Sequence, residues 1–580
     1  MKKTDKTYKY IRIRIFITGF LFTMVFSAIA AKAVYLQVYR GPWLAKKAAD
    51  QYELSFKTAG KRGTIYDKYN SEMAVSIYVT SIGAYPKRLK DSGAVAKALS
   101  KALNMDRRLL VKKLDKTKSF VWIKRKVTPK ETEMIKNMNM VGVCFIPEYN
   151  RFYPNKTLAA QAIGFTGIDG YGLEGIEYYY NEHLKGPESE ITIKKDALGN
   201  GFEMDRSPLS NQNGHNIRLT IDKTVQYITE KALKETVQKF KAQSGMAIVM
   251  APDTGAILAM AHLPFFNPNS FEGFESEHWR NRILADQFEP GSTMKIFSAA
   301  AAIESGACFP DTIFYCENGK YKIGDKTIHD AKPYGWLSLK KVIKYSSNIG
   351  AVKITETTGS ETLYNTLRDF GFGEKTGIDF PGEATGSLAH YKQWSPLDAA
   401  AISFGQGISV SALQLITAAS VIANDGMMMK PYIVQSISDY NGKMIKTFRP
   451  KKIKRVISTE TARAVRKIMR SVITEGGTGT KAGIDGYSFC GKTGTAQKID
   501  ENGKYAKGKY IASFIGFTNS ENPEAAILVV IDEPMLAHYG GDVAAPAFRK
   551  IAHEILNYLN MPPKREMENL LVSREIRTKG

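Results

Sequence analysis

Three short motifs in this chain carry side chains that can transfer an acyl group. The first is Ser292 followed by Lys295, directly after the turn Pro290-Gly291 and ahead of the apolar stretch 296–303. In a helix that begins there, residues three apart are neighbours on one face. A serine is a weak nucleophile that needs an adjacent base, and a lysine serves as that base when burial lowers its pKa. The alternative is that Ser292 only caps the helix and that Lys295 is a solvated charge.

The second motif, Ser346-x-Asn348, follows further along the chain. The hydroxyl of Ser346 can relay a proton between Lys295 and a leaving group, and Asn348 can hold a substrate amide. Taken alone, both are ordinary surface polar residues. The motif therefore gains meaning only from what precedes and follows it.

The third motif, Lys492-Thr493-Gly494, lies near the end of the chain in a stretch typical of a strand. Lys492 is expected to keep a cleft positive and to lower the pKa of Lys295 by like-charge repulsion. Gly494 has no Cβ, which allows the backbone of a substrate to approach the strand closely.

The three motifs S-x-x-K, S-x-N and K-T-G, in this order, are the signature of penicillin-interacting serine acyltransferases. The backbone N–H groups of Ser292 and Thr495 are the candidates for an oxyanion hole that stabilises a tetrahedral intermediate. The 8 histidines include no H-E-x-x-H pattern, so we expect no metal site.

The elements that must position these motifs read as an antiparallel sheet of about five strands, with helices on one face and a helical insert after the second strand. The predicted strands are 245–250, 256–261, 486–495, 509–518 and 525–532, and the predicted helices include 223–241, one that begins at Ser292, and 545–559. The insert is expected to be mostly helical as far as Asn424. The order of these elements predicts an α+β domain over residues 215–562.

The amino terminus carries a compartment signal. Six lysines and arginines within residues 1–14 precede an uncharged apolar stretch, 15–31, which continues apolar through 38 apart from Lys32. A bilayer core needs about 20 helical residues, so 15–38 is predicted to be a transmembrane anchor with a cytoplasmic amino terminus. The alternative is a signal peptide cleaved after one of the small-residue sites near Ala30.

Residues 39–214 mix short strands with amphipathic helices and are predicted to form a non-catalytic domain. Helices are expected at 94–103 and up to Asn137, the latter capped by Thr128 with Pro129 at its first position. The strings 62–67, 151–154 and 172–177 read, taken singly, as turns and packing. The loop 207–214 is the expected boundary.

Composition narrows the partners and the chemistry. The net charge of +24 over 580 residues favours a polyanionic neighbour, and no nucleic-acid-binding motif is present, so anionic lipid or an acidic polymer is preferred. Of the 4 cysteines, Cys308 and Cys316 are close enough for a disulfide in an oxidising compartment. Buried free thiols are the equal alternative.

On these motifs the chain resembles the class B penicillin-binding proteins, and most of all their division-specific (FtsI-type) D,D-transpeptidases. The resemblance covers nearly the whole chain and includes further matching strings: 62–67, 151–154, 172–177, 286–295, 346–350, 404–407, 492–495 and 538–546. Departures from the family pattern, such as Ser411-Ala412 in place of Thr-Pro, touch no reacting group. The implied architecture is a cytoplasmic tail (1–14), an anchor (15–38), an elongated α+β pedestal (39–214), a transpeptidase domain with a helical subdomain (215–562) and a basic tail (563–580).

The resemblance implies that Ser292 attacks the D-Ala-D-Ala end of a stem pentapeptide with Lys295 as base. It implies that Lys492, Thr493 and Thr495 hold the terminal carboxylate, and that β-lactams trap Ser292. It also implies an extracytoplasmic catalytic domain at the cell (inner) membrane, and binding of a SEDS-type glycosyltransferase and other division proteins through anchor and pedestal. The implied mechanism needs no metal and no organic cofactor. Nucleic acid is not an expected partner.

Three alternatives stay open at this point. A serine β-lactamase or D,D-carboxypeptidase would pass the acyl group to water, and a β-lactam sensor or scaffold would keep only a vestigial cleft. An elongation-type transpeptidase would share the chemistry but not the division role. The chain ends at Gly580 without appended repeats, which we expect to separate it from sporulation-type relatives.

Overall fold

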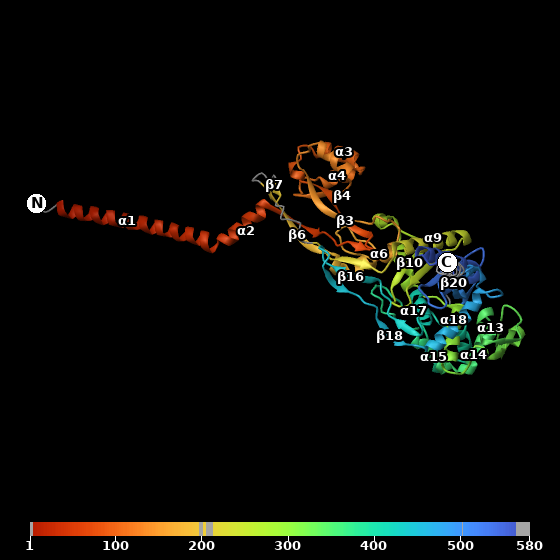
Figure 1. Cartoon of the computed structure of the whole chain (residues 1–580). Helices are drawn as coiled ribbons and strands as arrows, with labels where there is room; N and C mark the ends of the chain where they lie inside the picture. The colour runs from red at the N-terminus through yellow and green to blue at the C-terminus, as the bar shows by residue number, and fades with distance from the viewer. Residues whose placement is uncertain (1–3, 196–200, 205–212, 501–502, 564–580) are drawn as a thin grey trace, which may run out of the picture. The chain divides into compact units, whose positions relative to one another are not determined.

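The computed structural model describes residues 4–195, 201–204, 213–500 and 503–563 (Figure 1). The chain divides into two compact units, one of residues 1–60 and 187–212 and the other of residues 61–186 and 213–580. Most of the predicted boundary loop 207–214 and of the predicted basic tail lies outside the described residues.

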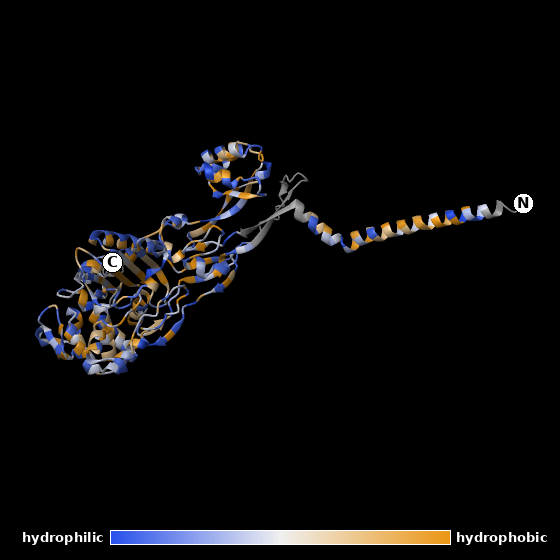
Figure 2. Cartoon of the chain, turned by 180° about the vertical axis from the view of Figure 1, so that it is seen from behind, coloured by the Kyte–Doolittle hydropathy of each residue, from blue (hydrophilic) through white to orange (hydrophobic). Residues whose placement is uncertain are grey.

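The first unit begins with a long apolar helix. Its elements are α1 (Thr4–Val34), the π-helical turn η1 (Tyr35–Tyr39), α2 (Gly41–Tyr52) and a three-stranded sheet in the order β1 (Glu53–Gly60), β6 (Gly186–Lys195), β7 (Gly201–Met204). The segment Thr7–Tyr39 has a mean hydropathy of 2.0, is not buried, and is long and apolar enough to cross a bilayer. Figure 2 shows the apolar residues along this helix. The segment Thr7–Tyr39 suggests a single-pass membrane anchor. The cytoplasmic position of its amino terminus and its retention in the mature chain stay predictions.

In the second unit, a seven-stranded sheet joins the two halves of the sequence. Its order is β17 (Met444–Thr447), β16 (Val434–Ser438), β8 (Asn216–Leu219), β2 (Ile65–Tyr66), β3 (Glu72–Ala84) and β4 (Val121–Val127), with β5 (Val143–Phe152) also paired to β3. Strand β8 pairs in parallel with β2 and antiparallel with β16. The sheet thus runs across the predicted domain boundary near residue 214.

Small helices complete the amino-terminal part of this unit. They are α3 (Ser92–Leu103), α4 (Arg107–Lys113), α5 (Pro129–Asn137), α6 (Ala160–Ile163), α7 (Gly175–Tyr179) and α8 (Asn181–Leu184). The predicted start of α5 is confirmed, since the side chain of Thr128 accepts from the backbone of Glu131 in a reciprocal capping box and Pro129 takes the first position.

The catalytic half is built on a five-stranded antiparallel sheet, as predicted. Its order is β10 (Ile257–Leu263), β9 (Ser244–Met250), β21 (Ala526–Asp532), β20 (Tyr505–Phe517) and β19 (Cys490–Ile499). Strand β9 is buried throughout, which fits its continuous apolar sequence. Strand β19, which carries the Lys-Thr-Gly motif, lies at one edge, so one side of it is free of a neighbouring strand within the sheet.

Helices cover both faces of this sheet, which corrects the expectation of one face. On one face α9 (Lys223–Phe240) and α19 (Gly540–Tyr558) pack on apolar residues such as Val249, Val529 and Phe514. On the other face α12 (Lys295–Glu304) and α17 (Ala412–Ala423) pack on residues such as Ile248 and Leu528. The correction follows from the strands themselves, because consecutive apolar residues point to opposite faces and both faces need cover.

The insert after β10 contains short strands as well as helices, so it is less uniformly helical than expected. Its helices are α10 (Ser276–Trp279), α11 (Arg282–Ala285), α13 (Leu339–Tyr345), α14 (Asn348–Thr358), α15 (Ser360–Asp369) and α16 (Pro396–Ser403). Its strand pairs are β11 (Ile313–Tyr315) with β14 (Trp336–Ser338) and β12 (Lys320–Ile323) with β13 (Lys326–His329). After the insert come β15 (Met427–Met429) paired with β18 (Lys452–Arg455), and then α18 (Thr459–Ile473). Cys308 and Cys316 are both buried free thiols, which is the second of the two alternatives; the structure has no disulfide between them.

Candidate active site

Ser292 lies in a 3₁₀ turn, η5 (Gly291–Met294), immediately before α12. It does not cap the helix, because the residue at the N-cap of α12 is Met294 and the Ser292 side chain makes no capping hydrogen bond. The turn is pressed against the edge strand: a Cβ on Gly291, whose φ is +54°, would come within 2.7 Å of the Thr495 carbonyl oxygen. The capping alternative is therefore wrong, and the half-buried Ser292 hydroxyl is left for other contacts.

Lys295, one turn on, is fully buried and faces the second motif rather than Ser292. Its ammonium group donates to the backbone oxygen of Ser346 at 2.7 Å, to the Ser346 hydroxyl at 3.3 Å and to Asn348 Oδ1 at 2.7 Å. Within the described residues it makes no hydrogen bond to Ser292. In enzymes without bound substrate such catalytic contacts are often long, so this geometry does not exclude Lys295 as a base.

The Ser346 hydroxyl joins the two lysines. It lies 2.9 Å from the ammonium nitrogen of Lys492, which also donates to the backbone oxygen of Thr493 at 3.1 Å. Ser346 terminates α13 in the left-handed conformation, with φ of +61°. A β-unbranched polar residue tolerates this conformation at some cost, and here it turns the hydroxyl toward both ammonium groups.

Five of the predicted site residues line one pocket of about 450 Å³, whereas Lys295, Lys492 and Gly494 are not among its lining residues. Its lining includes Ser292, Ser346, Asn348, Thr493 and Thr495, with further residues from several elements: Gly291, Ala331, Tyr345, Phe404, Gln406, Thr478, Tyr539, Gly540, Gly541 and Asp542. The motifs, far apart in the sequence, are therefore brought together as the sequence predicts.

Comparison with known proteins decides the family. Residues 245–553 match the model of the penicillin-binding protein transpeptidase domain, and residues 57–219 match that of the penicillin-binding protein dimerisation domain. The chain belongs to the class B penicillin-binding proteins. One relative is the probable peptidoglycan D,D-transpeptidase PenA of Neisseria meningitidis, which is 34% identical to this chain over 550 residues. The aligned residues cover 94% of this chain and 92% of the relative.

Two more relatives show how broad the family likeness is. Peptidoglycan D,D-transpeptidase FtsI of Escherichia coli is 32% identical and the alignment covers 93% of this chain and 91% of FtsI. Stage V sporulation protein D of Bacillus subtilis is also 32% identical, with 93% and 85% covered. Among solved structures, penicillin-binding protein 3 of Mycobacterium tuberculosis in complex with aztreonam superposes with a TM-score of 0.68 at 28% identity, covering 88% of this chain and 99% of that one. Because the likeness extends to a sporulation protein as well, it does not decide the cellular role of this chain.

In this penicillin-binding protein the two site lysines are electrostatically perturbed. Burial lowers the pKa of Lys295 to about 7, and the carboxylate of Asp330 opposes that shift. Burial and then the charge of Lys295 hold the pKa of Lys492 well below its ordinary value. Burial is the first cause for both lysines, and the charge of Lys492 is not among the causes that act on the pKa of Lys295. The expectation that repulsion by Lys492 is what lowers the pKa of Lys295 is corrected accordingly.

Asp330 is a residue at this site that the motifs do not reveal. Its Oδ1 accepts from the backbone N–H groups of Asn348 and Ile349, and its Oδ2 accepts from the Ser347 hydroxyl at 2.6 Å. The carboxylate thereby holds the first turn of α14, where its negative charge interacts favourably with the positive end of the helix dipole. It also fixes Asn348 beside Lys295. Local capping rules cannot find it, because it lies 18 residues before the helix that it caps.

Gly494 is required by the packing of β19. A Cβ there would lie 2.2 Å from Ser513 Oγ on β20 and 2.9 Å from Thr293 Cγ2 in η5. A side chain would therefore push the edge strand away from its neighbour and from the turn that carries Ser292. This packing reason stands beside the expected one, close approach of a substrate, which stays a prediction.

The three strings of the amino-terminal half converge on one buried ion-pair cluster. Glu177, which is fully buried, pairs with Arg62 Nε at 2.5 Å and with Arg151 Nε at 2.5 Å, and accepts from the Tyr153 hydroxyl at 3.3 Å. Burial acts to raise the pKa of Glu177, but the two guanidinium groups outweigh it and hold the pKa below its ordinary value. The three strings 62–67, 151–154 and 172–177 therefore pack against one another, as expected. The buried ion pairs at the centre of this contact could not be predicted from any one of the strings.

Proposed function

We propose that this protein cross-links peptidoglycan through an acyl-enzyme on Ser292. The observation that carries the proposal is the position of the Ser346 hydroxyl, 2.9 Å from the Lys492 ammonium and 3.3 Å from that of Lys295, in a pocket that Ser292 also lines. A serine nucleophile needs a nearby amine that is neutral at working pH and a path for its proton. A pKa of about 7 makes Lys295 such an amine.

In the first step, Ser292 Oγ attacks the carbonyl carbon of the penultimate D-Ala of a stem pentapeptide. Neutral Lys295 takes the hydroxyl proton, and Ser346 relays a proton to the leaving nitrogen as the C–N bond breaks and D-Ala departs. The backbone N–H groups of Ser292 and Thr495 hold the oxyanion. The product is an ester between Ser292 and the shortened stem.

The binding roles follow from the charges of the site. Lys492, Thr493 and Thr495 hold the terminal carboxylate of the stem, and Asn348 orients its amide. The edge position of β19 supports this, because an extended peptide can lie along a strand that has no neighbour on one side. In the second step an amine of a neighbouring stem attacks the ester, forms the cross-link and frees Ser292.

A covalent label tests the nucleophile. β-Lactams resemble the acyl-D-Ala-D-Ala end and leave a slowly hydrolysed ester on the serine, so a fluorescent penicillin is expected to label the wild-type chain and not Ser292→Ala. Equal labelling of the two would remove Ser292 from this role. Rapid loss of label would favour a β-lactamase or carboxypeptidase, and absence of labelling in a folded wild type would favour a scaffold.

The division role and the membrane partners belong to the same proposal. The apolar segment Thr7–Tyr39 would hold the chain in the inner membrane with its catalytic domain outside, and the anchor and pedestal would bind a SEDS-type glycosyltransferase and other division proteins. The likeness to E. coli FtsI supports septal action. Depletion of the protein is then expected to give filamentous cells, whereas rounded cells would indicate the elongation role.

A further inference from the structure

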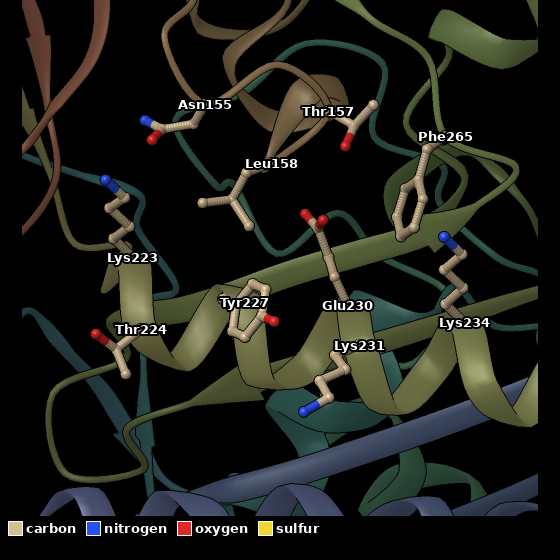
Figure 3. Close-up of a pocket in the computed structure, with 10 residues that line it drawn as sticks. All are labelled: Asn155, Thr157, Leu158, Lys223, Thr224, Tyr227, Glu230, Lys231, Lys234 and Phe265. Atoms are coloured by element: carbon tan, nitrogen blue, oxygen red, sulfur yellow. The ribbon is translucent and has the colours of Figure 1, made fainter.

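A second cavity, of about 770 Å³, lies between helix α9 and the loop 155–158 (Figure 3). It shares no lining residue with the active-site pocket. Leu158 and Phe265 give it apolar walls, and polar side chains of α9 line the side opposite the loop. Its size is within the range of ligand sites in proteins.

A buried carboxyl group of α9 points into this cavity. Glu230 is only 7% exposed, and its Oε1 accepts from the backbone of Ala159 at 2.7 Å and from Gln226 Nε2 at 2.8 Å. Its second oxygen, Oε2, has no hydrogen-bond partner among the described residues, and Figure 3 shows the carboxyl group directed at the space beside Leu158 and Thr157. Burial raises the pKa of Glu230 to about 7. Oε2 is not one of the fully enclosed side-chain atoms of the described residues, so it is open to the cavity and can accept a hydrogen bond from a ligand there.

Ammonium groups flank this carboxyl along the helix. Lys223 and Lys234 both line the cavity, and Figure 3 shows their side chains on the loop side of α9. Neither ammonium group forms an ion pair or hydrogen bond with another described residue. At a rise of about 1.5 Å per residue, Lys223 and Lys234 are roughly 16 Å apart along the axis, and Glu230 lies roughly 6 Å from Lys234.

We propose that this cavity is a second ligand site that binds an extended dianion with a hydrogen-bond donor between its two anionic groups. Lys223 and Lys234 bind the anionic ends, Oε2 of Glu230 accepts from the donor, and the apolar walls contact the body of the ligand. Carboxylates of a peptide and phosphates of a polyol both supply this chemistry. The site does not depend on the activity proposed for Ser292.

The test measures binding of two probes to the full-length chain carrying Ser292→Ala, which separates this site from acylation. The probes are a γ-glutamyl peptide with two carboxylates and a glycerol-phosphate trimer, and the uncharged glycerol trimer is the control ligand. Calorimetric titration is expected to show binding of one of the charged probes. The probe that binds identifies carboxylate or phosphate as the source.

Variants then locate the site. Lys223→Gln and Lys234→Gln are each expected to weaken binding about tenfold, because each removes one charged hydrogen bond. Glu230→Gln places an NH₂ where Oε2 was, so it cannot accept from the ligand and is expected to weaken binding by a similar factor. Lys239→Gln, on the same helix but outside the cavity, is the matched control and should bind as the parent does. Equal affinity in all four variants, or no binding of either charged probe at about 10 mM, would overturn the proposal.

Discussion

The ammonium group of Lys492 donates to the hydroxyl of Ser346 over 2.9 Å. This contact links the edge strand of the catalytic sheet to the turn between α13 and α14, two elements that the chain brings together from positions 146 residues apart. The same hydroxyl is 3.3 Å from the side-chain nitrogen of Lys295, so one small side chain connects both lysines of the site. The arrangement makes Ser346 the natural route for a proton between Lys295 and a leaving group.

Ser346→Ala is expected to lower the rate of acylation by penicillin about 10²–10⁴-fold, the range for loss of a positioned proton-transfer group. The fold should persist, because α13 ends through hydrogen bonds of the Ser346 backbone N–H and not through the Ser346 hydroxyl. Stopped-flow measurement with a fluorescent penicillin gives the rate, and thermal unfolding checks the fold. Ser305→Ala, an exposed serine outside the pocket, is the control; an unchanged rate in Ser346→Ala would exclude the relay.

The acylation rate is expected to rise with pH and to level off above about pH 7, because Lys295 must be neutral to act as base and its pKa is about 7. Below that value the rate should fall about tenfold per pH unit. The stability of the fold should also rise with pH. The pKa of Lys295 in the folded chain lies below the value of 10.5 for an ordinary lysine, so between these two values the unfolded chain binds more protons than the folded chain, and raising the pH favours folding. A rate that is flat between about pH 5.5 and 8 would contradict a titrating base.

Asp330→Asn should act on the same pH profile. Its carboxylate raises the pKa of Lys295 against the effect of burial, so its removal is expected to move the acidic limb of the profile to lower pH. A merely structural role would lower the plateau without moving the limb. Asn348 also loses its anchor, and since hydrogen bonds to charged groups contribute roughly 1.5–3 kcal/mol each, a loss of about 2 kcal/mol in stability is expected. Asp325→Asn, in an exposed turn between β12 and β13, should change neither quantity.

Much of this site follows from the sequence, because each motif carries its own chemical reason and the order of the three is specific. The capping box at Thr128, the five strands and the meeting of Ser292, Ser346 and Lys492 are of this kind. The capping box and the strands depend on local rules, which act within a few residues of the chain, whereas the meeting of the three motifs is predicted from their joint chemistry and order.

Features that depend on distant contacts are missed. Asp330 caps a helix from 18 residues away, and the charged centre at Glu177 joins residues more than 100 apart. Helix α19 begins at Gly540 rather than at the predicted Ala545. The Gly540 N–H donates to Thr495 Oγ1 at 3.1 Å, a contact across the pocket that no local pattern contains. Likewise Ser292 lies in a 3₁₀ turn because Gly291 packs on β19, not because of its own capping propensity.

Glu177→Gln is expected to lower the stability of the folded chain by about 3–5 kcal/mol, because it leaves two buried guanidinium groups without their shared carboxylate. The wild-type contribution is present above the ordinary glutamate pKa and is lost as pH falls through the depressed pKa of Glu177, so the gap between variant and wild type should narrow in acid. Thermal unfolding at about pH 7 and pH 4 measures both effects. Glu182→Gln, which removes an exposed pair with Lys185, is the matched control and should change stability by less than about 1 kcal/mol. Equal unfolding temperatures for the two variants would mean that the cluster contributes little, and that the three strings meet at Glu177 for a reason other than stability.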